Sequence, residues 1–172
     1  MKTKKKLTPP KKPEFKIYLE IKETTVHESY EGGRYGSWEK TYDCAITKAV
    51  KNRELLSGWN THEFSVDESV FNASSIFVVY VKHTDGDSFG QWSGNLSIAW
   101  VTSDANEAIK VKNIIEEEDK RQKEERWQRH GSKQKNKTDT GWTTISEKVG
   151  YPSWWGYFNR VENVGIEILT LY

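Results

Sequence analysis

Two short apolar runs, separated by a glycine-bearing segment, constrain this chain more than any other feature. Residues Ile76–Val81 are β-branched or aromatic and precede an Asp-Gly-Asp turn signal, so they predict a strand buried on both faces. In Asn95–Val101 apolar residues alternate with small or polar ones, which is typical of a second strand. Three glycines between the runs allow the positive φ that a chain reversal requires. Residues 84–94 are therefore predicted to form the long tip of an antiparallel hairpin.

A long charged helix is predicted directly after the second run. Asp104 suits the N-cap position, and Glu107 follows three residues later, as in a capping box. Apolar residues from Ala105 to Ile115 form a narrow stripe. Beyond Ile115, acidic residues precede basic ones by four positions, and each such pair contributes about 0.2–0.5 kcal/mol. We expect one helix over 104–129, its first half packed on the sheet and its second half projecting into water.

The rest of the chain completes an α+β domain. Alternating apolar residues predict strands at 15–22, 38–50 and 161–171. The alternation at 61–66 is weak, and 143–149 is a further candidate. The predicted fold class is α+β, an antiparallel-rich sheet of about five strands with one main helix, which a charged insertion extends. Residues 1–13 are expected to be a disordered Lys-rich tail. Residues 14–172 are expected to form a single domain, in which 116–141 is the charged helical extension and flexible loop.

Composition limits the classes of function. The net charge is +1, but the first twelve residues hold six lysines and no acid, so the body is mildly acidic and disfavours a nucleic-acid groove. A lone cysteine excludes an intramolecular disulfide and a thiolate metal cluster. Because no run approaches the roughly 18 apolar residues of a membrane span, we expect a cytoplasmic protein.

The segment Gly86–Gly90 also matches the G-x-S-x-G pattern of a nucleophilic serine. That pattern requires a strand-to-helix elbow, whereas this segment leads to another strand, so the context argues against it. A small metal-dependent hydrolase is an alternative, with His83, Asp85, Asp87 and Ser88 in the reactive loop. Asp-Gly-Asp is also ordinary hairpin-turn chemistry, in which the carboxylates accept backbone hydrogen bonds. The turn interpretation is favoured.

Aromatic residues are abundant, with eight tryptophans in 172 residues. Several stand in turn-like segments beside glycine or proline, where aromatic side chains are enriched at binding surfaces but are as often lids over a core. Trp38, Trp59 and Trp142 are read as core or cover. The predicted binding residues are Asp85, Asp87, Ser88, Phe89, Trp92, Trp154, Trp155 and Tyr157.

The Val79-Tyr-Val81 run, the Asp85–Gly90 turn and the Trp155–Phe158 segment together carry a family resemblance. They resemble a loose group of small uncharacterised proteins of bacteriophages and some Gram-positive bacteria, over about residues 76–116 and 151–171. The resemblance implies a phage or mobile-element accessory protein, a class rich in host-defence inhibitors. No catalytic residues are assigned in that group, so it implies none here.

These observations favour a non-enzymatic binding protein without a cofactor. Its partner is expected to be a host protein or a small nucleotide-like ligand, stacked on the tryptophans, with an anionic group meeting the glycine amides of the loop. The alternative is nucleic-acid association through the lysines of the tail and of 133–137, and the tail can equally be read as a solubilising segment. The tail lysines are Lys2, Lys4, Lys5, Lys6, Lys11 and Lys12.

Overall fold

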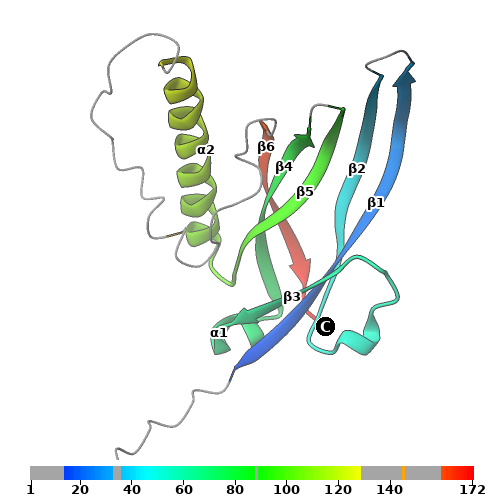
Figure 1. Cartoon of the computed structure of the whole chain (residues 1–172). Coiled ribbons are helices and arrows are strands. Elements are labelled where there is room, and N and C mark those ends of the chain that lie inside the picture. The colour runs from blue at the N-terminus through cyan, green and yellow to red at the C-terminus, as the bar shows by residue number, and fades with distance from the viewer. Residues whose placement is uncertain (1–13, 33–35, 88, 129–144, 146–159) are drawn as a thin grey trace, which may run out of the picture.

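The computed structural model describes residues 14–32, 36–87, 89–128, 145 and 160–172. It shows a mixed α+β fold in which a long helix lies beside a six-stranded sheet (Figure 1). The strands are β1 (Phe15–Glu31), β2 (Ser37–Val50), β3 (Thr61–Val66), β4 (Ser75–Gly86), β5 (Gly90–Thr102) and β6 (Arg160–Thr170). The helices are α1 (Glu68–Phe71), α2 (Ala105–Gln128) and a short 3-10 turn, η1 (Arg53–Leu55).

The strand order is β3-β1-β2-β5-β4-β6, and every neighbouring pair is antiparallel except β2 and β5. The predicted α+β class and antiparallel-rich sheet are confirmed, but the described sheet has six strands, not about five. The short strand β3 alternates only weakly, yet its backbone pairs with Phe15–Glu20 of β1. The sheet therefore has one strand more than predicted, because β3 is held by backbone pairing, which local side-chain periodicity does not report.

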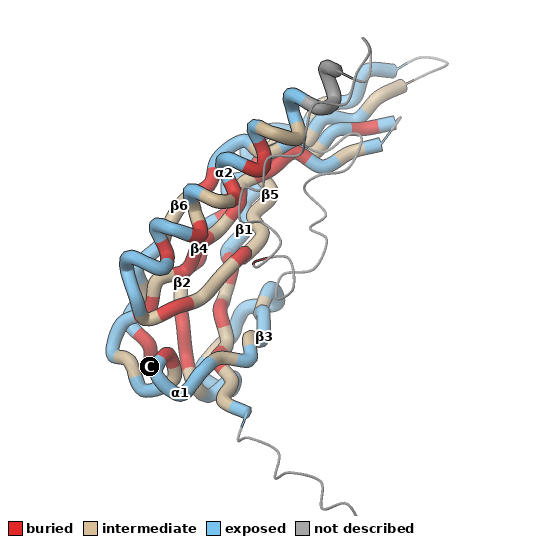
Figure 2. Tube along the Cα trace, turned by 90° about the vertical axis from the view of Figure 1, so that its left-hand side faces the viewer, coloured by how far each residue is buried: buried red, intermediate tan, exposed pale blue. Residues whose placement is uncertain are grey.

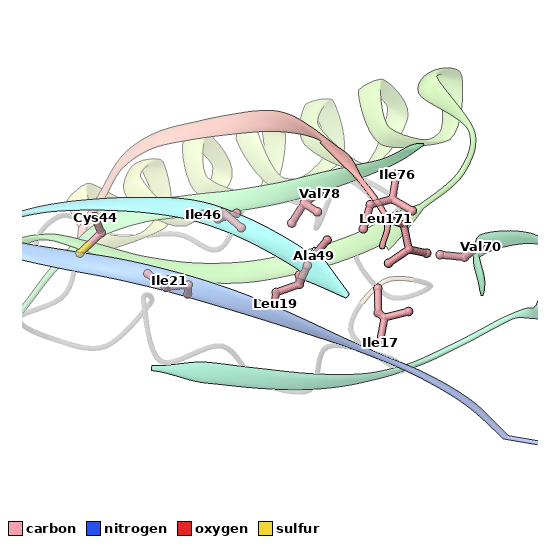
Figure 3. Close-up of a cluster of buried hydrophobic side chains, with 10 residues drawn as sticks. All are labelled: Ile17, Leu19, Ile21, Cys44, Ile46, Ala49, Val70, Ile76, Val78 and Leu171. Atoms are coloured by element: carbon pink, nitrogen blue, oxygen red, sulfur yellow. The ribbon is translucent and has the colours of Figure 1, made fainter. Parts of the chain in front are cut away.

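Two apolar cores lie on opposite faces of β4, because successive side chains of a strand point to opposite sides. Val78 belongs to the first core, with Ile17 and Leu19 of β1 and Ile46 of β2. Figure 3 shows these side chains between the β1–β2 hairpin and β4. Val79 belongs to the second core, which α2 covers. Each fully buried valine, leucine or isoleucine contributes about 1.5–3 kcal/mol by leaving water.

Helix α2 begins much as predicted. The Asp104 carboxylate accepts a hydrogen bond from the Asn106 backbone N–H at 2.8 Å. The Glu107 carboxylate does not close a capping box but accepts the Thr102 hydroxyl, and Thr102 Oγ1 in turn accepts the Asp104 N–H at 3.1 Å. The end of β5 and the start of α2 are thus tied together by one side-chain relay. Neither described helix is apolar enough over a sufficient length to cross a membrane.

The prediction that the second half of α2 projects into water is wrong at Glu118 and Asp119. The side chains of Glu118 and Asp119 are buried, with relative exposures of 2% and 9%. Arg121 donates to Glu118, and Lys123 lies 2.5 Å from the Asp119 carboxylate. A buried carboxylate is tolerated when a cation and hydrogen bonds compensate its lost hydration. Figure 2 shows buried positions at intervals along α2 as well as along the strands.

The candidate strand at 143–149 can be compared with the structure at one position. Ile145, the only described residue between 129 and 159, is helical and buried in the second core, so the candidate strand at 143–149 is wrong at that position. The expected disordered tail and the flexible-loop part of the insertion lie outside the described residues.

Gly94 is the point at which β5 changes register against β4. Ser93 and Gly94 both lie opposite Thr84, because His83 pairs with Asn95 and Asp85 pairs with Trp92. Gly94 has φ of +76°, and a Cβ at this position would lie 2.0 Å from the Tyr42 carbonyl oxygen of β2. A β-bulge with these features requires glycine.

Replacement of Gly94 by alanine should lower the free energy of unfolding by more than about 2 kcal/mol, because the backbone is left-handed and the added methyl meets a carbonyl. Gly32→Ala is the matched control, since its Cβ would meet only the Tyr30 ring at 3.8 Å. Urea unfolding should place Gly32→Ala within about 0.5 kcal/mol of the wild type. Equal stability of the two variants would contradict the bulge assignment.

Candidate functional site

A short parallel pairing brings two hairpin tips side by side. Strands β2 and β5 pair from Trp38 beside Gly90 to Thr41 beside Ser93, and the Trp38 N–H donates to the Phe89 carbonyl at 2.9 Å. The β1–β2 and β4–β5 tips therefore meet at one end of the molecule (Figure 1). We call residues 27–32, 36–41, 85–87 and 89–92 the tip.

Aromatic side chains form a row across three strands of the tip. Tyr30 of β1 pairs with Trp38 of β2, and their ring centroids lie 4.6 Å apart. In the parallel pair Trp38 lies beside Gly90 and Lys40 beside Trp92, so these side chains share one face of the sheet. The Trp92 ring covers Gly90, where an added Cβ would lie 3.1 Å from it. We call Tyr30, Trp38 and Trp92 the aromatic row.

The aromatic row is open to solvent. Tyr30 is 52% exposed and Trp38 43% exposed, while Trp92 is half-buried. Phe89, in the turn beside the row, is 70% exposed. Four large aromatic side chains from two hairpins thus gather at one end of the sheet.

The sequence identified this site only in part. Of the predicted binding residues, Asp85, Asp87, Phe89 and Trp92 lie in the tip, whereas Ser88, Trp154, Trp155 and Tyr157 lie outside the described residues. Tyr30 and Trp38 were missed, because local periodicity does not show that β2 will pair with β5. One signal was available in the sequence. Trp38 has the same alternation as Tyr42 and Cys44, so it lies on the strand face that is buried in the core, at a position outside the core itself.

The Asp85 and Asp87 carboxylates have turn roles. Asp87 Oδ1 accepts the N–H groups of Phe89 and Gly90 at 2.7 and 3.0 Å, and Asp85 Oδ1 accepts the Gly86 N–H at 2.8 Å. This confirms the turn interpretation of Asp-Gly-Asp. The loop predicted over 84–94 is shorter than expected, because β4 ends at Gly86 and β5 begins at Gly90. Both flanking elements are strands, so the segment is not a strand-to-helix elbow.

Carboxylates also occupy the glycine amides that were predicted to meet an anion. Glu162 of β6 accepts the Gly94 N–H at 3.2 Å and the Thr84 hydroxyl at 2.6 Å. The amides of Gly86 and Gly90 bind Asp85 and Asp87. The prediction of an anion site at these amides is therefore wrong, since each already has a negatively charged acceptor within the protein.

The described tip is acidic. It holds five carboxylates and a single lysine, Lys40, which pairs with Glu28 at 3.0 Å. The five are Glu28, Glu31, Glu39, Asp85 and Asp87. A surface with this balance repels anions and attracts cations.

His83 lies inside the protein instead of at the tip surface. Its side chain is 4% exposed, and Nε2 lies 2.9 Å from the Ser97 hydroxyl. Burial lowers the pKa of His83, although the nearby Asp85 and Glu162 carboxylates oppose the shift. Within the described part of the chain, no group of three or more His, Cys, Asp or Glu side chains is arranged to hold a metal ion.

Comparison with known proteins gives no relative for this chain. No family model matches it, and neither does any curated protein or solved structure. The resemblance to phage proteins therefore stays a prediction, and the geometry of the tip carries the functional argument.

The stability of the protein should fall as the pH is lowered below about 6.5. Burial lowers the pKa of His83 in the folded state, so below the ordinary pKa of 6.5 the unfolded chain takes up a proton more readily than the folded protein does. His83→Gln removes this titration, so the free energy of unfolding should depend less on pH between about 7 and 5, by at most about 1.4 kcal/mol per pH unit. Denaturant unfolding at several pH values measures the slope, and an unchanged slope would refute the role of His83.

Proposed function

We propose that the protein is a non-enzymatic binding module that grips another protein with its tip. The observation that carries this proposal is the aromatic row, exposed on paired strands. Aromatic side chains give much contact area with few rotamers to freeze, and they dominate the binding energy of protein interfaces. Because the row lies on hydrogen-bonded strands, little backbone entropy is lost when a partner binds.

The charge of the tip supports a protein partner over a nucleotide-like one. A nucleotide brings phosphate, and the described tip offers it five carboxylates, one paired lysine and glycine amides already bound. A protein surface with arginine or lysine around an apolar centre matches the tip better. Arginine in particular stacks on aromatic rings and pairs with carboxylates.

The biological setting proposed here is that of a phage or mobile-element accessory protein acting on a host protein, for example as a host-defence inhibitor. This part depends only on the resemblance carried by the Val79–Val81, Asp85–Gly90 and Trp155–Phe158 segments. The hydrolase alternative gains no support from the tip, because Asp85 and Asp87 are engaged in the turn and His83 is buried.

Replacement of Trp38 by alanine should abolish capture of the partner. The variant and the wild type, immobilised in parallel, are exposed to a host extract, and bound proteins are quantified by mass spectrometry. A true partner, once purified, should bind Trp38→Ala at least about tenfold more weakly by calorimetry, since central interface aromatics contribute about 2 kcal/mol or more.

Trp59→Ala is the matched control for this experiment. Trp59 is fully exposed but lies between η1 and β3, outside the tip. Its replacement should leave both folding and capture unchanged. If Trp38→Ala folds, as circular dichroism can show, and still binds every protein that the wild type binds, the tip is not the binding surface.

A further inference from the structure

The spacing of the aromatic row suits one particular kind of protein segment. Neighbouring strands lie about 4.8 Å apart, so the row spans about 10 Å across β1, β2 and β5. A polyproline II helix rises about 3.1 Å per residue with three residues per turn, which puts every third residue on one edge, about 9 Å apart. Prolines in such a helix pack onto exposed aromatic side chains, at low entropic cost because the helix is preformed.

The chain itself contains a segment of this chemistry. Pro10 and Pro13 are three residues apart, and Lys11 and Lys12 lie between them. The preceding residues add Pro9 and four more lysines, so the N-terminal thirteen residues carry six positive charges and no acid. This segment and the acidic tip are complementary in charge, and the proline spacing matches the aromatic row.

A molecule cannot place this segment on its own tip. Glu14 precedes β1, whereas Tyr30 lies at the far end of the same strand, about 50 Å away at about 3.3 Å per residue. Residues 10–13 extend at most about 14 Å from Glu14. Figure 1 shows the start of β1 and the paired hairpin tips at opposite ends of the molecule.

We propose that the tip of one molecule binds the proline- and lysine-bearing N-terminal segment of a second copy. The inference rests on the proposed function and names a partner for the same surface. Pro10 and Pro13 pack against the aromatic row, while Lys11 and Lys12 lie beside Glu28 and Asp85, the two carboxylates whose strand positions share the row's face of the sheet. The two surfaces in this contact differ, so it is heterologous, and repetition gives a ring or an open chain of molecules.

Complementation between two full-length variants tests this proposal. Pro10→Gly/Pro13→Gly keeps the tip but removes the docking segment, and Trp38→Ala keeps the segment but removes the centre of the row. Wild-type protein should show concentration-dependent association in sedimentation velocity. Each of the two variants, measured alone, should associate at least tenfold more weakly than the wild type. An equimolar mixture of the two variants should form a one-to-one complex, because each supplies the surface that the other lacks.

Two further measurements separate this contact from other forms of association. Lys11→Glu/Lys12→Glu should weaken association, and 1 M salt should weaken that of the wild type, because the charges of the contact are exposed. A synthetic peptide of residues 1–13 should quench the tryptophan fluorescence of the Pro10→Gly/Pro13→Gly protein, and its analogue with glycine at positions 10 and 13 should not. Trp59→Ala, a control outside the tip, should associate like the wild type. If Trp38→Ala fails to fold, Tyr30→Ala replaces it as the tip variant.

The proposal falls if the wild type stays monomeric and the peptide does not bind up to about 1 mM. It also falls if association occurs but survives both the proline and the Trp38 substitutions, or if the mixed variants do not combine. Capture of a host protein through Trp38 without binding of the peptide would sink this inference while supporting the proposed function. The two failures are therefore distinguishable.

Discussion

The arrangement of this protein depends on a short stretch of parallel backbone pairing between β2 and β5. It runs from Trp38 beside Gly90 to Thr41 beside Ser93, and it joins two hairpins that each pair antiparallel within themselves. Parallel neighbours need a long crossover connection, and here η1, β3, α1 and β4 all lie within it. Without this pairing the two tips would be separate ribbons, and the aromatic row would not exist.

The β2–β5 pairing ends at Thr41 beside Ser93, and the two strands diverge beyond it (Figure 1). The bulge at Gly94 lies at this point, against the Tyr42 backbone. Glu162 then binds the Gly94 amide and the Thr84 hydroxyl, which links β6 to the bulge across β4. Unsatisfied polar groups in a sheet are costly, so one carboxylate both stabilises the irregularity and fills the local anion-binding positions.

Much of the fold could be predicted from the sequence, because the local periodicity of apolar residues indicates most of its strands and its long helix. The alternation of Ile17, Leu19 and Ile21 predicted β1, and the change of period after Val101 predicted where α2 begins. The continuation of β1 to Glu31 could not be read in this way, since its second half buries almost nothing and is held by pairing with β2. Long-range pairing depends on both strands at once, and periodicity within either one does not report it.

The parts of the candidate site that depend on adjacent residues could be predicted, and the parts that depend on long-range pairing could not. Asp85 and Asp87 have the turn roles that Asp-Gly-Asp chemistry indicates, and both depend only on adjacent residues. Tyr30 and Trp38 reach the site through the β2–β5 pairing, which no local pattern contains. Burial of Glu118 in α2 could not be predicted either. A run of charged residues indicates a solvent-exposed helix face, and only the packed structure shows which of these side chains are covered.

The exposure of the aromatic row is itself informative, because an apolar ring left in water gains nothing for folding. Tyr30 and Trp38 could have been replaced by polar β-formers without disturbing either core, since neither ring belongs to one. Gly90 in turn leaves room for the Trp92 ring and forgoes its own side chain. Trp59 gives the contrast, a fully exposed ring on a connection between elements rather than on paired strands. In the aromatic row, rings in contact with one another are held on hydrogen-bonded backbone and left uncovered. Their order is established before a partner arrives, so binding gains the burial of apolar surface that folding left exposed.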